Sequence, residues 1–350
     1  MKLKLFLMLM VTSLIGLTGC SDENETISVS EITVNETSME LKVGETATLT
    51  ATVLPENATD KTIVWSSSDD AVVTVDETGT VTAVGPGTAT VSVMAKNGGV
   101  KATCEVIVTL KDPVLGDYYF SDGTYASEID ANKEVIGIVF WVGDPTASDP
   151  ALKREHPECT HGLVVALNEV VTPWQYNWEQ YGKDKLVGDW IKSNTEYESI
   201  ATKTKPEDNM NKIIGYNNTK GIECFNADPS NSEWKVEAVE EVVKYRESHP
   251  TPVHTSGWYF PSLKELSLLC TGEWEGTIWD IANETDMRDF IAEKLANVPN
   301  ADPFNNVGYW SSSEYAPSSA YYLSITDGAG YNDLRKSYKS NLALRCIFAF

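Results

Sequence analysis

Small apolar residues alternate with threonine in short runs from residue 28 to about residue 110, and this alternation limits the segment to a β fold. In TATLTATV the apolar side chains fall on one side of an extended chain, at Ala47, Leu49, Ala51 and Val53. TATVSVMA repeats the pattern at Ala89, Val91 and Val93. The turn-forming sequences VGE, ETG and GPG separate the runs. Strict alternation over several short, turn-bounded runs predicts an antiparallel β-sandwich.

The last run, KATCEVIV, places Cys104 on the same side as its apolar residues, so we expect a small buried thiol there. The sequences LKVGETATLTATVLPENA and VWSSSDDAVVTVDETGTVTAVGPGTATV resemble bacterial immunoglobulin-like domains of group 2 (BIG2) over residues 29–110. The resemblance implies a stalk or adhesion module of a surface protein. It also implies that Trp65 packs in the core instead of forming a ligand platform.

The chain begins with Lys2 and Lys4, a short apolar run and the tetrapeptide LTGC. A charged start before a short apolar run is typical of a secretory signal. The apolar run is too short for a transmembrane helix. LTGC resembles the lipobox of bacterial lipoproteins. This implies a signal peptide over residues 1–19 and a lipidated Cys20 that attaches the protein to the outer membrane. The alternative is an ordinary signal peptide with an incidental cysteine.

An acidic tether, residues 20–28, follows the predicted lipid anchor. Its sequence SDENE resembles the signal that takes Bacteroidetes lipoproteins to the cell surface, although a solvated linker has the same composition. The whole chain has a formal net charge of −24, from 27 Lys+Arg and 51 Asp+Glu. Removing Lys2 and Lys4 leaves 25 minus 51, or −26. A field of this sign repels phosphate backbones, so we expect no nucleic-acid partner.

Residues 114–350 form a second module of mixed composition. EVIGIVFWV and HGLVVAL are continuous apolar runs suited to buried strands, and the Trp- and Asn-rich region 172–232 predicts loops with short helices. EWKVEAVEEVVKYRES predicts a helix with Val236, Val239 and Val243 on one face. PSLKELSLLC predicts a helix that starts with a Ser262–Glu265 capping box. TDMRDFIAEKLANV predicts a third helix, and short strands close the chain.

GWYFPSLKELSLL, YWSSSEY and NLALRCIFAF resemble domains of the DUF1566 and Fibrobacter major-paralogous type. The resemblance covers 238–350 well and 117–168 loosely, and it implies an α+β C-type-lectin-like fold. Trp310 then starts an interior strand. Such folds bridge a helix to the last strand, which implies a Cys270–Cys346 disulfide, with Cys159–Cys224 as the second pair. Of the five cysteines after Cys20, only Cys104 then has no disulfide partner.

The stretch YWSSSEYAPSSAYYLSI supplies the candidate ligand-binding residues. Alternation along its second half places Tyr321, Leu323 and Ile325 opposite Tyr322 and Ser324, so one face is buried and the other wet. Serine and tyrosine on strands and loops make adaptable contacts. We expect exposure, and a glycan or protein ligand, at Tyr315, Tyr321, Tyr331, Asn332 and Asp333.

Residues 331–333 also resemble the Trp-Asn-Asp motif of calcium-dependent lectins. The companion Glu-Pro-Asn or Gln-Pro-Asp loop is missing, so the motif is better explained by a polar hairpin turn than by a calcium site. HPECTH brings His156, Cys159 and His161 together, but no second Cys-His cluster completes a zinc set. We therefore expect no metal and no cofactor.

No catalytic motif with an activated nucleophile occurs in the sequence, so we expect no enzyme activity. The leading hypothesis is a surface adhesion protein whose second module binds the ligand while the first acts as a stalk. The alternative is a structural or tip subunit of a surface fibre. A formylglycine-generating type of enzyme is the third hypothesis, and it requires reactive thiols at Cys270 and Cys346.

Overall fold

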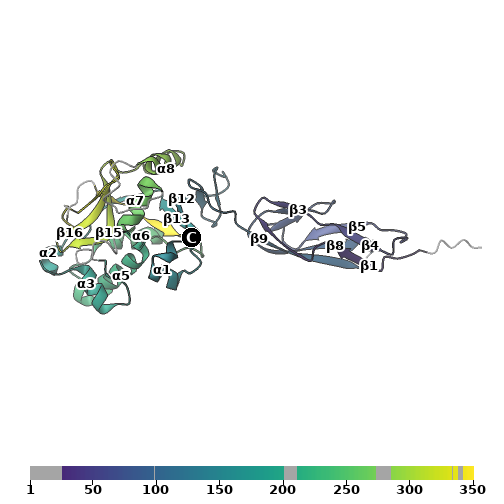
Figure 1. The fold of residues 1–350 in the computed structure, drawn as a ribbon, viewed down its shortest axis with the longest axis horizontal. Coiled ribbons are helices and arrows are strands. Elements are labelled where there is room, and N and C mark those ends of the chain that lie inside the picture. Colours follow the sequence, from purple (N-terminus) through teal and green to yellow (C-terminus); the bar gives the residue numbers. More distant parts are fainter. Residues whose placement is uncertain (1–25, 98, 201–210, 273–284, 333, 338–341) are drawn as a thin grey trace, which may run out of the picture. The chain divides into compact units, whose positions relative to one another are not determined.

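The computed structural model describes residues 26–97, 99–200, 211–272, 285–332, 334–337 and 342–350. The chain divides into two compact units, Met1–Lys111 and Asp112–Phe350 (Figure 1). The predicted signal peptide, Cys20 and most of the acidic tether lie outside the described residues. Within the described part, none of the helices has the length and apolar character needed to cross a membrane.

The first unit is built from strands. They are β1 (Glu31–Val34), β2 (Ser38–Lys42), β3 (Thr46–Thr48), β4 (Ala51–Leu54), β5 (Ile63–Ser67), β6 (Val73–Val75), β7 (Thr80–Ala83), β8 (Gly87–Ala95) and β9 (Lys101–Thr109). One sheet has the order β2-β9-β8-β5, a second has the order β3-β7-β6, and β1 pairs with β4. All pairs are antiparallel except β2 with β9.

The predicted alternation holds in the first unit. Cys104, Val106 and Val108 are buried along β9, while the residues between them are exposed. Trp65 is half-buried and packs against both apolar clusters of the unit, as expected for a core residue. The run TATLTATV forms two strands instead of one, because β3 pairs with β7 and β4 pairs with β1.

The strands of the second unit form two sheets. They are β10 (Tyr118–Phe120), β11 (Tyr125–Ala126), β12 (Val135–Val142), β13 (Gly162–Ala166), β14 (Val170–Val171), β15 (Gly308–Ala316), β16 (Ser319–Ser324), β17 (Gly330–Tyr331), β18 (Leu342–Leu344) and β19 (Ile347–Ala349). The first sheet has the order β11-β10-β12-β13-β19 and the second β14-β18-β15-β16-β17. Only β15 and β18 pair in parallel among the pairs of these sheets.

Helices surround these sheets (Figure 1). They are η1 (Pro145–Ala147), α1 (Pro150–Glu155), α2 (Trp178–Tyr181), α3 (Val187–Asn194), α5 (Gly215–Ala227), η2 (Pro229–Asn231), α6 (Glu237–Ser248), α7 (Leu263–Thr271) and α8 (Asp286–Ala296). The second unit therefore combines helices with mostly antiparallel sheets.

Both faces of the first sheet are covered, which explains the continuous apolar runs of β12 and β13. Val139 and Val164 face a cluster that includes Val239 and Val242 of α6. Their neighbours along the strands face a second cluster, which includes residues of α1, α7 and α8. A strand buried on both faces needs no polar alternation, so its sequence is apolar throughout.

The predicted helices are present, with one error in the face of α6. The Ser262–Glu265 capping box is formed as expected. Val236 and Val239 are buried, but Val243 is 39% exposed and Val242 takes its place in the core. Since Val242 and Val243 are adjacent, a face drawn through the wrong one rotates by about 100°.

Neither predicted disulfide is formed, because all five described cysteines are free. Cys270 and Cys346 are buried in different apolar clusters. The thiol of Cys159 points at the main-chain carbonyl of His254, with Sγ 3.8 Å from the oxygen, and Cys224 lies half-buried on α5. The pairings implied by the C-type-lectin-like resemblance are therefore corrected.

Candidate functional site

The aromatic stretch of β15 and β16 divides between two faces of its sheet. Tyr321 is only 1% exposed, so its expected role at the surface is wrong. Its ring packs edge-to-face against half-buried Tyr315, with centroids 5.4 Å apart. The predicted alternation itself is correct, since Tyr321, Leu323 and Ile325 are buried and Tyr322 and Ser324 are partly exposed.

Tyr331 lies on the other face of this sheet. It is 38% exposed and stacks on Tyr322, the residue opposite it in the β16–β17 register, with ring centroids 5.5 Å apart. Its hydroxyl donates to Asp327 Oδ2 at 2.8 Å. Asn332 is half-buried beside it, and Asp333 lies outside the described residues. Because Tyr321 and Tyr322 point to opposite faces, Tyr315 and Tyr331 do not belong to one continuous ligand surface.

Trp310 is fully buried, as the sequence predicted, and its indole Nε1–H donates to the carbonyl of Thr172 at 3.0 Å. Further along β15, the carboxylate of Glu314 is also fully buried. It forms an ion pair with buried Lys336. These contacts join β15 to segments that are distant in the sequence.

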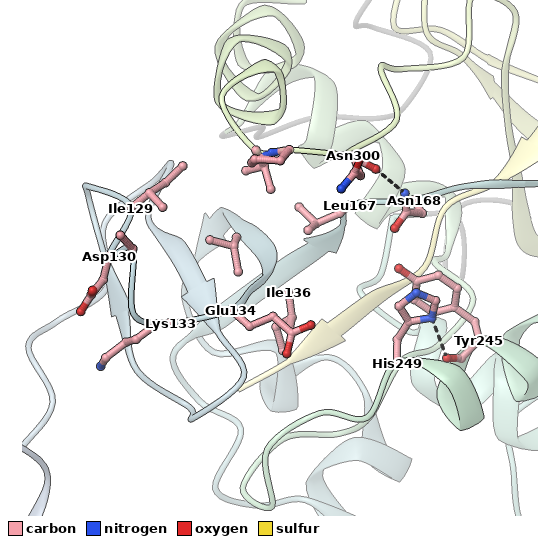
Figure 2. A pocket seen from close by; sticks show the side chains of 14 residues that line it. Ile129, Asp130, Lys133, Glu134, Ile136, Leu167, Asn168, Tyr245, His249 and Asn300 are labelled. Carbon is pink, nitrogen blue, oxygen red and sulfur yellow. Dashed lines mark hydrogen bonds between the residues drawn. The ribbon is translucent and has the colours of Figure 1, made fainter.

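A pocket of about 460 Å³ lies elsewhere in the second unit (Figure 2). Four segments far apart in the sequence meet there: residues 129–136 leading into β12, Leu167–Asn168 after β13, Tyr245 and His249 at the end of α6, and residues 298–300 after α8. The lining mixes aliphatic side chains with amide, carboxylate and imidazole groups. This mixture suits a polar ligand with some apolar surface.

Two aromatic rings form one wall of the pocket. The imidazole of exposed His249 stacks on the ring of Tyr245, with centroids 4.1 Å apart and planes 13° apart. His249 Nδ1 lies 2.9 Å from Ser248 Oγ and 3.3 Å from the carbonyl oxygen of Tyr245. Burial raises the pKa of Tyr245, so its hydroxyl stays neutral. The stack thus presents a fixed ring surface from the end of a helix.

An amide contact joins two further segments of the pocket lining. Asn168 Nδ2 donates to the carbonyl oxygen of Asn300 at 3.0 Å and to Asp302 Oδ2 at 3.3 Å. Asn300 has φ of 64°, a left-handed conformation that asparagine tolerates better than most residues. Figure 2 shows this contact above the Tyr245–His249 stack.

A second hollow of about 270 Å³ continues the pocket, because it shares Asn168, Tyr245 and His249 with it. It adds Glu241 and Lys244 from α6 to the lining. We call these two adjoining hollows the groove; Asn168 and the Tyr245–His249 stack line both of them. Sequence reasoning missed this groove because it depends on four separate segments; the aromatic pair spaced i, i+4 on α6 was its one local signal.

The HPECTH segment is divided by the fold. His156, Glu158 and Cys159 bring their ligand atoms within 4.8 Å of one another. His161 instead stacks on Phe350, with ring centroids 6.1 Å apart. Of the potential zinc ligands considered from the sequence, His161 therefore lies outside the cluster, and Glu158 lies within it.

Residues 28–106 match the family model of the bacterial Ig-like domain (group 2). This match confirms the resemblance found in the strand pattern of the first unit.

Curated relatives extend the comparison. A protein of Bacteroides ovatus named "Putative fimbrium tip subunit Fim1C" is 28% identical over 249 residues, which is 62% of this chain and 41% of that protein. Lacto-N-biosidase of Bifidobacterium bifidum is 47% identical over 90 residues, which is 26% of this chain and 8% of that enzyme. The chain thus spans less than half the length of either relative, and it is homologous to a Bacteroides fimbrial tip subunit.

A solved structure of a fimbrial protein from Bacteroides ovatus has a similar fold. It superposes with a TM-score of 0.55 at 18% identity, and the superposition covers 93% of this chain and 71% of that one. The larger unit, 112–350, is less than 93% of the chain, so the similarity in fold includes both units.

Proposed function

We propose that the protein is a subunit of a bacterial surface fibre, located at the fibre tip, with the immunoglobulin-like unit as a spacer and the second unit as the head. The homology to a fimbrium tip subunit carries this proposal. The fold shared with a fimbrial protein over both units supports it. The comparisons favour this interpretation, the alternative from the sequence, over a stand-alone adhesin.

Fibres sheared from the producing cells test the proposal. We expect the protein to co-purify with the fibres and an antibody against residues 112–350 to label their ends in electron micrographs. Cells that lack the gene serve as the control and lose the label. Protein that remains in the cell envelope, with none on the sheared fibres, would contradict the fibre proposal.

A binding head is the second candidate function, and the groove around Tyr245 and His249 favours it. An aromatic stack beside amides and carboxylates presents both a ring face and hydrogen-bonding groups to a glycan. Tyr315, Tyr331, Asn332 and Asp333 are further candidate contacts proposed from the sequence. A protein ligand and a calcium requirement belong to the same proposal.

A glycan and matrix-protein array probed with residues 112–350 tests this function. We expect binding to fall at least about tenfold when His249 becomes alanine, since the stack lines both hollows of the groove. The matched control is His254→Ala, an exposed histidine that does not line the groove. A chelator arm reports on calcium. Equal loss in both variants would contradict a site at the stack.

Lipid attachment at Cys20 and a C-type-lectin-like origin of the head remain parts of this proposal. The lipobox resemblance supports the first, and the closing strands with YWSSSEY support the second. Metabolic labelling with a fatty-acid analogue is expected to mark the protein and to fail for Cys20→Ser.

We propose a role without catalysis. Burial raises the pKa of the Cys270 and Cys346 thiols to about 12 in each case. Reactive cysteines require a lowered pKa, so these two thiols do not suit a formylglycine-generating type of enzyme.

A further inference from the structure

A tight turn after α1 brings three potential metal ligands close together. The amide of Cys159 donates to the carbonyl of His156 at 3.1 Å, which closes the turn around Pro157 and Glu158. Proline at the second position favours such a turn. The ligand atoms of His156, Glu158 and Cys159 consequently lie within 4.8 Å of one another.

The tautomer of His156 follows from its neighbours. Its Nε2 lies 3.1 Å from the hydroxyl oxygen of Tyr216, and that hydroxyl donates its own proton to Glu155 Oε2 at 2.8 Å. Arg154 pairs with Glu155 and favours the carboxylate, which can only accept. The oxygen of Tyr216 must therefore accept from Nε2–H, which leaves Nδ1 as the ring nitrogen on the side of Glu158.

His156 Nδ1 lies close to two other potential ligand atoms. His156 Nδ1 lies 3.7 Å from Glu158 Oε1, and the sulfur of Cys159 lies within the same cluster. A ring nitrogen, a carboxylate and a sulfur grouped this closely are ligand types that a metal ion accepts. The hydrogen bonds from His156 through Tyr216 to Glu155 are the kind of support that orients a metal-binding histidine.

We propose that His156 Nδ1, the Glu158 carboxylate and the Cys159 thiolate bind one Zn²⁺ ion. Nitrogen, oxygen and sulfur are the ligand types that zinc accepts, and its ligand atoms lie about 3.5 Å apart in tetrahedral sites. Rotation of the exposed Glu158 side chain closes the remaining gap. A fourth position on the solvent side is left for water.

Zinc binding at this site releases a proton. Metal-free Cys159 is a buried thiol whose Sγ lies 3.8 Å from the carbonyl oxygen of His254. Zn²⁺ displaces the thiol proton to solvent as the Zn–S bond forms, and no oxidant or reductant takes part. We therefore expect the apparent affinity to rise with pH.

Titration of the purified, reduced and chelator-treated protein with Zn²⁺ tests the site, with Co²⁺ as a spectroscopic probe. We expect one ion per chain and a sulfur-to-cobalt charge-transfer band. Cys159→Ser removes this band, and Glu158→Gln lowers the affinity at least about tenfold. Tyr216→Phe, which removes only the support of His156, weakens binding about 10–100-fold.

His161→Gln and Cys224→Ser are the matched controls, because both residues lie outside the cluster. Both variants are expected to bind zinc like the parent protein. Glu158 is exposed, so a loss in Glu158→Gln is not explained by unfolding. The proposal is overturned if the parent protein binds no zinc, if the band persists in Cys159→Ser, or if Glu158→Gln binds with unchanged affinity.

Discussion

Glu265 combines a role in local structure with complete burial. Its Oε2 accepts from the amide of Ser262 at 2.6 Å, and its Oε1 accepts from the hydroxyl of Tyr259 at 2.9 Å. Burial nevertheless raises the pKa of Glu265 to about 7, and it raises the pKa of nearby Asp149 to about 6. The capping box was predictable from the sequence, whereas the burial depends on the whole core.

The raised pKa of Glu265 predicts a specific pH dependence. The folded protein binds this proton more tightly than the unfolded chain, whose glutamate titrates near its ordinary value of 4.5. The contribution of protonated Glu265 to the free energy of unfolding is therefore complete below about pH 4.5, and it is lost as pH rises through about 7. We expect the free energy of unfolding to fall over this range by about 1–3 kcal/mol more in the parent protein than in Glu265→Gln.

Urea unfolding at a series of pH values measures this difference. Glu247→Gln, at an exposed position on α6, is the control and should follow the parent curve. Parallel curves for the parent protein and Glu265→Gln would show that Glu265 titrates normally.

The free cysteines give a second prediction at the scale of residues. Cys104, Cys159, Cys270 and Cys346 are buried, whereas Cys224 is only half-buried. In the native protein without reductant we expect Cys224 to react first with a thiol reagent, and all five to react after denaturation. Mass spectrometry of the labelled peptides identifies each site, and Cys224→Ser should remove the fast reaction. A disulfide-linked peptide containing Cys270 and Cys346 would contradict the free thiols and support the disulfide predicted from the sequence.

Helices and strands were predictable where a pattern within one segment determines them. The apolar runs of β12 and β13, the capping box of α7 and the alternation along β16 all appear as expected. The groove was not predictable, because its four segments come together only in the folded chain. The exposure of Tyr321 failed for a related reason: a tyrosine among serines looks exposed, but its strand face is covered by α7 residues.

The start of α3 shows how distant elements support one another. Its N-cap, Leu186, has no side-chain acceptor. Instead, the Glu314 carboxylate from β15 accepts from the amides of Val187 at 3.0 Å and Gly188 at 2.8 Å. Buried Lys336 pairs with the same carboxylate and lies over the ring of Trp174, at 4.6 Å from its centroid. A carboxylate 126 residues away thus caps the helix and suits its positive end.

Breaking this buried ion pair should be costly. Lys336→Met leaves the Glu314 charge in the core, and we expect the free energy of unfolding to fall by about 3–5 kcal/mol. The double variant Lys336→Met with Glu314→Gln should recover part of this loss, because the uncompensated charge is gone. Chemical unfolding of residues 112–350 measures both changes.

An exposed ion pair supplies the control for this prediction. Lys235→Met removes the partner of Glu240 on the surface and should cost no more than about 1 kcal/mol. If Lys336→Met cost no more than this control, the pair would not hold β15 and α3 together.

Each of the two units has apolar clusters of its own. The clusters around Leu49 and Val93 draw only on the first unit, and the three clusters of the head draw only on residues 112–350. The composition change after LKDP marks this division in the sequence. The proposed ligand and fibre contacts depend on surfaces that no single segment specifies.

Separate cores predict that the two units fold independently. We expect calorimetry of the whole chain to show two transitions, each matching that of an isolated unit, 26–111 or 112–350, because each apolar cluster of the described residues lies within one unit. The isolated first unit should have a β-type circular dichroism spectrum. A single transition, or a head that is unfolded alone, would contradict independent folding. Independent folding matters to the fibre proposal, because a spacer that folds by itself positions the head without depending on what the head binds.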